Sequence, residues 1–125
     1  MQLGDGMMDV LPKADDVVIA TDKFTKYVLH PKNSNGKHFA FERALGYTLE
    51  NHNALIENIR TNIKNFPAKM QINKGHGVRY SVEMELLGSN GRRANVMTAW
   101  MDDKDTGTMR LISAYVKKRK GENDD

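Results

Sequence analysis

Cysteine is absent from the 125-residue sequence, which excludes disulfide bonds and cysteinyl metal sites. No apolar run approaches the roughly 20 residues that a membrane-spanning helix needs, so we expect no membrane span. The first eight residues carry neither a basic flank nor a long apolar stretch, and we therefore expect no signal peptide. The net charge is only +3, which permits binding to a polyanion without requiring it.

Common metal and nucleotide motifs are also absent. The four histidines fall in different predicted elements, and no two of them have the i,i+4 spacing of a helical ligand pair. The HExxH, Walker, GxGxxG and GxSxG patterns are missing as well. We therefore expect neither a metal site nor a cofactor.

The length suits one domain with a single core. We expect residues 1–16, which are broken by Gly4, Gly6 and Pro12, to form a flexible lead-in. Residues 17–116 then form the domain, and residues 117–125 form a charged tail that begins with a basic run.

Three helices are predicted in the first half of the domain. The first is a short helix that Thr21-Asp22 can cap, and the second follows Gly36-Lys37 and closes at Gly46. The third begins at a cap on Thr48 and runs to about residue 65. Its apolar side chains recur at three- and four-residue spacing, namely Leu55, Ile56, Ile59 and Ile63.

An antiparallel meander is predicted from Val78 to Val116, and residues 68–72 are a candidate further strand. Apolar and polar residues alternate from Val78 to Leu86, which is typical of a half-buried strand. Asn90-Gly91 is a strong hairpin signal, and a type I′ turn there pairs Ser89 with Arg92. The predicted fold class is therefore α+β, with N-terminal helices packed on one face of a C-terminal antiparallel sheet.

This predicted register assigns the two faces of the sheet. Met84 lies opposite Met97 and Val82 opposite Ala99, and the buried side holds Tyr80, Val82, Met84, Leu86, Met97, Ala99, Met101, Ile112, Ala114 and Val116. The other face carries Arg79, Ser81, Glu83, Glu85, Thr98, Trp100, Ser113 and Tyr115. Aromatic side chains among polar ones suggest a recognition surface, and the alternative is that Trp100 and Tyr115 pack beneath another element.

His38 occupies the opening turn of the second predicted helix. Backbone N–H groups and the helix dipole favour an anion there, and Lys37 adds a positive charge. A phosphate at this point would have His38 within reach for proton transfer. The alternative is an ordinary surface histidine near a helix start.

Four stretches carry a resemblance to a known family: G-K-H-F-A-F-E-R-A-L-G-Y, G-V-R-Y-S-V-E-M-E-L, R-R-A-N-V-M-T-A-W and R-L-I-S-A-Y-V. Over residues 11–116 the chain resembles toxin domains at the C-termini of bacterial polymorphic toxins, including CdiA-type contact-dependent inhibition proteins. Its layout is similar to the barnase–EndoU–colicin–RelE group. The resemblance implies metal-independent cleavage of RNA, often tRNA, through attack of the ribose 2′-OH on the adjacent phosphate. It also implies a cognate immunity protein and action in the cytoplasm of a target bacterium.

The resemblance also implies site residues. His38 matches the histidine of the family's helix-opening K-H pair, and the sheet positions match at Arg79, Thr98, Trp100 and Tyr115. We expect His38 to act as general acid or base and the charges of Arg79 and Lys37 to stabilise the phosphorane. Hydrogen bonding, base stacking and further substrate contacts are assigned to Thr98, Tyr115, Trp100, Glu83 and Ser113, with Glu83 as a possible base. The two glutamates on this face depart from the more basic surface of such toxins. The alternative function is a non-catalytic binding module, such as an adaptor or an immunity-type protein.

Overall fold

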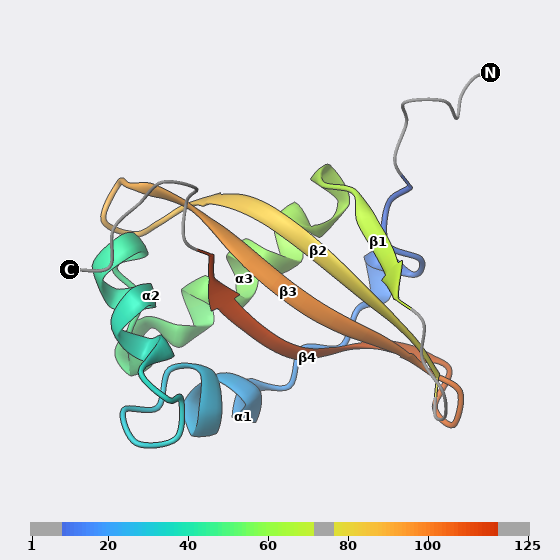
Figure 1. Cartoon of the computed structure of the whole chain (residues 1–125), viewed down its shortest axis with the longest axis horizontal. Coiled ribbons are helices and arrows are strands. Elements are labelled where there is room, and N and C mark those ends of the chain that lie inside the picture. The colour runs from blue at the N-terminus through green and yellow to red at the C-terminus, as the bar shows by residue number, and fades with distance from the viewer. Residues whose placement is uncertain (1–8, 72–76, 118–125) are drawn as a thin grey trace.

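The computed structural model describes residues 9–71 and 77–117, in which helices come first and a four-stranded antiparallel sheet follows (Figure 1). The helices are α1 (Thr21–Lys23), which continues as the π-helical turn η2 (Phe24–Val28), α2 (Lys37–Leu45) and α3 (His52–Asn62). The strands are β1 (Ala68–Gln71), β2 (Gly77–Leu87), β3 (Arg93–Asp103) and β4 (Thr108–Val116), in the spatial order β1-β2-β3-β4. The predicted α+β class, with helices on one face of the sheet, is confirmed.

Short 3₁₀ turns extend or connect these elements, at Ala14–Asp16, Leu49–Asn51 and Ile63–Asn65. The first of them lies in the predicted lead-in, whose described part, residues 9–16, is packed onto the domain instead of being loose. Leu11 is buried, and the Lys13 ammonium lies 2.7 Å from the Asp102 carboxylate. Residues 1–8 and residues 118–125 of the predicted tail lie outside the described residues.

The ends of α2 and α3 follow the predicted capping signals. Gly46 closes α2 with a φ of 78°, a left-handed conformation that glycine adopts without steric cost. Thr48 forms a capping box: its hydroxyl accepts from the Glu50 N–H at 3.2 Å, and its own N–H donates to Asn51 Oδ1 at 2.7 Å. The predicted apolar stripe of the following helix is buried in full, at Leu55, Ile56, Ile59 and Ile63.

The hairpin between β2 and β3 differs from the prediction by one residue. The Gly88 N–H donates to the Arg92 carbonyl at 2.7 Å, so the loop has three residues, Ser89 to Gly91. Gly91 has a φ of 84°, whereas Asn90 does not have the positive φ that a type I′ turn also requires. The predicted register is therefore wrong.

The shift turns β3 over, because a one-residue slip moves every side chain to the opposite face. Val82 lies opposite Thr98, and Met84 lies opposite Val96. The core beneath α3 therefore receives Val96, Thr98 and Trp100, while Met97, Ala99 and Met101 face the other way. The predicted placement of all five β3 side chains that the sequence assigned to a face, Met97 to Met101, is reversed for this reason.

Thr98 and Trp100 are fully buried, with 0% of each residue exposed. The Trp100 indole N–H donates to Thr98 Oγ1 at 2.8 Å, and the Thr98 hydroxyl donates to the Val82 carbonyl at 2.8 Å. Burying a polar group costs little when it is hydrogen-bonded, which explains how a threonine occupies the core. The prediction that both side chains lie on the exposed face is wrong.

A β-bulge changes the faces of β4. Ala99 pairs with Ser113 and Trp100 pairs with Leu111, so Ile112 is the extra residue. Ala114 is buried as predicted, whereas Ile112 is only half-buried and Leu111 takes the core position. The bulge is therefore the reason that the observed inner face of β4 includes Leu111 and not Ile112.

Candidate functional site

The sheet face opposite α3 carries no described helix in front of it (Figure 1). We call it the open face. Cross-strand partners share a face, so its side chains are those of Lys69, Gln71, Arg79, Ser81, Glu83, Glu85, Asn95, Met97, Ala99, Met101, Arg110, Ser113 and Tyr115. A central column of methionine and alanine side chains on β3 lies between two more polar columns on β2 and β4.

Two arginines lie in one cross-strand row of this face, on either side of β3. Arg79 on β2 and Arg110 on β4 are both partners of Met101. Neighbouring strands lie about 4.8 Å apart, so the two backbones are about 10 Å from one another. None of the ion pairs among the described residues includes either guanidinium. Both arginines are therefore available for an anionic ligand.

The next row of the open face has small side chains, with Ser81 and Ser113 on either side of Ala99. Ser81 accepts a hydrogen bond from Gln71 Nε2 at 3.0 Å. This row lies between the arginine row and the row of Met97, and its side chains project less from the sheet than those of its neighbours. Cations beside such a surface can hold a phosphate while a base or sugar contacts the floor.

Tyr115, Lys37 and Ser113 come together at the other end of the open face. Tyr115 lies opposite Met97 and is 39% exposed. The Lys37 ammonium, from the first residue of α2, lies 5.6 Å from the centre of the Tyr115 ring, within the range of a cation–π contact. Ser113 lines the same region from β4.

Arg79 does not join this group. Its row is four residues along β3 from the Tyr115 row, which corresponds to about 13 Å at about 3.3 Å per residue. The predicted site required Arg79 and Tyr115 to contact the same phosphate. This separation is too large for that. The open face instead offers two separate positively charged positions, one at each end.

Glu83 is held by two neighbours. Asn95 Nδ2 donates to one of its carboxylate oxygens at 2.6 Å, and the Lys117 ammonium donates to the other at 3.0 Å. The hydrogen bond from Lys117 and then that from Asn95 lower the pKa of Glu83, although partial burial opposes them. A carboxylate with a lowered pKa is a weaker base, so this environment disfavours the predicted base role. Glu83 also lies opposite Met97 and not opposite Thr98.

His38 lines a different pocket, of about 490 Å³. Its Nδ1 lies 2.8 Å from Ser34 Oγ, and its ring lies 4.1 Å from that of Phe39. The other lining residues are Leu29, Pro31, Glu42, Thr48, Leu49 and Glu50, which include two carboxylates and no lysine or arginine. His38 thus shares a pocket with two glutamates, whereas Lys37 lies over the ring of Tyr115 on β4.

The opening turn of α2 does not leave backbone donors free for an anion. The N–H groups of Lys37, His38 and Phe39 donate to Ser34 O, Ser34 Oγ and Gly36 O, each at 3.1 Å. The predicted phosphate site on these N–H groups is therefore wrong, because the loop before the helix already satisfies them. The charge of Lys37 remains.

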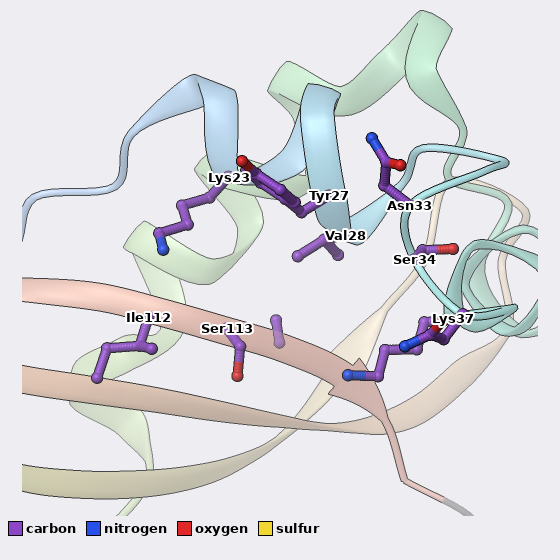
Figure 2. A pocket seen from close by; sticks show the side chains of 10 residues that line it. Lys23, Tyr27, Val28, Asn33, Ser34, Lys37, Ile112 and Ser113 are labelled. Carbon is purple, nitrogen blue, oxygen red and sulfur yellow. The ribbon is translucent and has the colours of Figure 1, made fainter.

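A groove runs between η2, the loop before α2 and the second half of β4 (Figure 2). It has a volume of about 270 Å³ and is lined by Lys23, Tyr27, Val28, Asn33, Ser34, Asn35, Lys37, Ile112, Ser113 and Ala114. We call it the two-lysine groove, since its lining includes two lysines and no acidic residue. Sequence reasoning missed Lys23 and Arg110, because their neighbours are far away along the chain.

Within residues 9–71 and 77–117, no three histidine, aspartate or glutamate side chains are grouped so as to hold a metal ion. No helix in this part of the chain is long and apolar enough to cross a membrane.

Together these features define a small α+β domain with an uncovered, arginine-bearing antiparallel sheet face. The chain belongs to a family described as a domain of unknown function (DUF6883), whose family model matches residues 10–118. No curated protein and no solved structure matches the chain.

Proposed function

We propose that this domain binds single-stranded RNA on the open face and cleaves it as a metal-independent ribonuclease toxin. The observation that supports it most is the row formed by Arg79, Met101 and Arg110, whose two guanidinium groups form no ion pair with any residue of the described part and lie next to a row of small side chains. Arginine is well suited to phosphate, because its planar group donates two parallel hydrogen bonds.

In this proposal the RNA strand runs along the open face from one charged end to the other. Arg79 and Arg110 hold one phosphate, and the strand crosses the small row to reach Lys37 and Tyr115. There the ribose 2′-OH attacks the adjacent phosphate, the bond from phosphorus to the 5′-oxygen breaks, and a 2′,3′-cyclic phosphate forms. Water takes the proton of the 2′-OH and supplies one to the leaving 5′-oxygen. Lys37 stabilises the negative charge that develops on the phosphate oxygens, and the Tyr115 hydroxyl donates a hydrogen bond to one of them. The exposed Tyr115 ring also offers a surface on which a base can stack.

The biological setting follows from the same proposal. The domain would act in the cytoplasm of a target bacterium, with tRNA as the main substrate. A cognate immunity protein would neutralise it by covering the open face or binding beside it.

A non-catalytic binding module is the second candidate, and one observation favours it. His38, the predicted general acid or base, does not lie on the open face. It lines the separate pocket that also contains Glu42 and Glu50. An open face that has no histidine among its described residues can bind RNA without holding one of these as the group that exchanges protons near neutral pH.

Tightly controlled expression separates the two candidates. A toxin ribonuclease arrests growth and fragments RNA on a gel, and the purified domain cleaves RNA in the presence of EDTA. The double variant Arg79→Gln/Arg110→Gln should lose this activity, while Arg43→Gln/Arg92→Gln, which removes two exposed arginines elsewhere, should keep it. RNA binding without cleavage would favour the binding module. If the domain neither binds nor cleaves RNA, both candidates are refuted.

A further inference from the structure

The two-lysine groove adjoins the end of the open face at which the proposed cleavage takes place. Lys37 and Ser113 belong to both places. The Lys37 ammonium lies 5.6 Å from the centre of the Tyr115 ring, and Lys37 also lines the groove. Ser113 lines the groove too, and it shares the open face with its cross-strand partner Ala99. An RNA strand that passes Lys37 on the open face therefore reaches the groove by turning over the edge of β4.

The size and lining of the groove suit one nucleotide. Its volume of about 270 Å³ is close to the lower limit of small-molecule pockets, which is about 300 Å³. Val28 and Ala114, both buried, and the half-buried Ile112 make part of its lining apolar. An apolar lining with a few polar groups is the usual arrangement of a pocket for a small organic group. The volume has room for one base and its sugar, and not for a run of nucleotides.

The polar and aromatic groups of the groove are of the types that contact unpaired bases. Tyr27, from η2, is 55% exposed, and aromatic rings of this kind stack on unpaired bases. The loop before α2 adds two exposed amides, those of Asn33 and Asn35. Asn33 Nδ2 donates to the Lys26 carbonyl at 3.0 Å, and its carbonyl oxygen can still accept from a ligand. Side-chain amides match the donor and acceptor groups along the edge of a base.

The two lysines come from different sides of the groove. Figure 2 shows Lys23 above Ile112 and Lys37 beyond Ser113, toward the end of β4. Neither ammonium forms an ion pair with a described residue, and the lining includes no carboxylate to compete with an anion. Every nucleotide within an RNA chain lies between two phosphates. Two lysines on either side of a groove for one nucleotide match this arrangement of charge.

We propose that the two-lysine groove is a nucleotide subsite that takes the unpaired base next to the phosphate held by Lys37. The base stacks on Tyr27 with its edge toward Asn33 and Asn35, and Lys23 pairs with the phosphate on its far side. This inference rests on the proposed function, because Lys37 belongs to the proposed cleavage site. It adds that the domain requires an unpaired nucleotide at this position and prefers some bases over others.

The first experiment tests the groove without an RNA chain. The amide signals of Ile112, Ser113 and Ala114 are followed in NMR spectra of the whole chain during titration with AMP, GMP, CMP, UMP and ribose 5-phosphate, which carries a phosphate and no base. At least one nucleotide should move these signals and bind about fivefold or more tightly than ribose 5-phosphate, the smallest effect expected of one base–aromatic stack. Tyr27→Leu should remove this advantage, whereas Phe39→Leu, at another exposed aromatic residue, should keep it. Equal binding of all five compounds, or binding that leaves the three signals in place, would overturn the proposal.

The second experiment separates this inference from the proposed function. In binding to single-stranded RNA, Lys23→Gln should reduce the slope of log K against log salt by about 0.7, the value for one lost phosphate contact. Lys32→Gln, at an exposed lysine outside the groove, should keep the slope. If Arg79→Gln/Arg110→Gln weakens RNA binding while Lys23→Gln and Tyr27→Leu do not, the subsite is wrong and the proposed function stands. If the wild type binds no RNA, the proposed function is refuted and the inference falls with it.

Discussion

The hydrogen bond between Trp100 and Thr98 gives a stability prediction that depends directly on the observed register. Thr98→Val keeps the shape of the side chain and leaves the buried Trp100 indole N–H without its acceptor at 2.8 Å. An unsatisfied buried donor costs about 1–3 kcal/mol of unfolding free energy. Thr61→Val, an exposed threonine on α3, is the control and should change stability by no more than about 0.5 kcal/mol.

A double-mutant cycle isolates this interaction. In a Trp100→Phe background the donor is gone, so Thr98→Val should cost less than about 1 kcal/mol, and the two changes should couple by about 1–2 kcal/mol. Urea unfolding followed by far-UV circular dichroism measures all four proteins, because the Phe variant lacks the only tryptophan. Additivity within about 0.3–0.5 kcal/mol would refute the hydrogen bond and, with it, the register that buries both residues.

Two further predictions concern the hairpin and the open face. Gly88→Ala should destabilise the domain by about 1–3 kcal/mol, because a Cβ there would lie 2.3 Å from the Leu45 carbonyl oxygen; an unchanged urea midpoint would contradict this. Glu83→Gln should cost at most about 1 kcal/mol at pH 7, since the ion pair with Lys117 is partly exposed to solvent. The lowered pKa of Glu83 makes this contribution complete above the usual value of 4.5 and lost as the pH falls through the folded-state pKa. Unfolding free energy should therefore fall less steeply below about pH 4.5 in the Gln variant than in the wild type, and parallel pH curves would count against the ion pair.

The order of the helices and strands could be predicted because local signals determine it. Gly46 and Thr48 set helix ends through backbone conformation and capping, which act within a few residues. The alternation along β2 correctly assigned Val82, Met84 and Leu86 to the core. None of these assignments needs knowledge of a distant partner.

The faces of β3 could not be predicted, because the register depends on the conformation of one loop. Asn90-Gly91 fits both a two-residue and a three-residue loop, and the two choices place opposite sides of β3 in the core. Trp100 and Thr98 appeared to suit a polar face because a sequence does not reveal that they bond to one another. Met97 and Met101 appeared to suit the core because their side chains are apolar.

Two other parts of the candidate site depend on long-range packing. Arg110 joins Arg79 only through the pairing of β4 with β3. Lys23 and Lys37 share a groove because η2 and α2 both pack beside the end of β4. His38 was predicted near a phosphate from its position in the chain, yet it contacts Ser34 and lines a pocket away from the open face.

The affinity for single-stranded RNA, measured against salt concentration by fluorescence anisotropy, tests the central claim most directly. Arg79→Gln/Arg110→Gln should weaken binding by about tenfold or more and reduce the slope of log K against log salt by about 0.7 for each lost phosphate contact. Arg43→Gln/Arg92→Gln, with the same change in net charge, should leave both quantities close to the wild type. If the two double variants behave alike, or if neither differs from the wild type, the open face is not the RNA-binding surface.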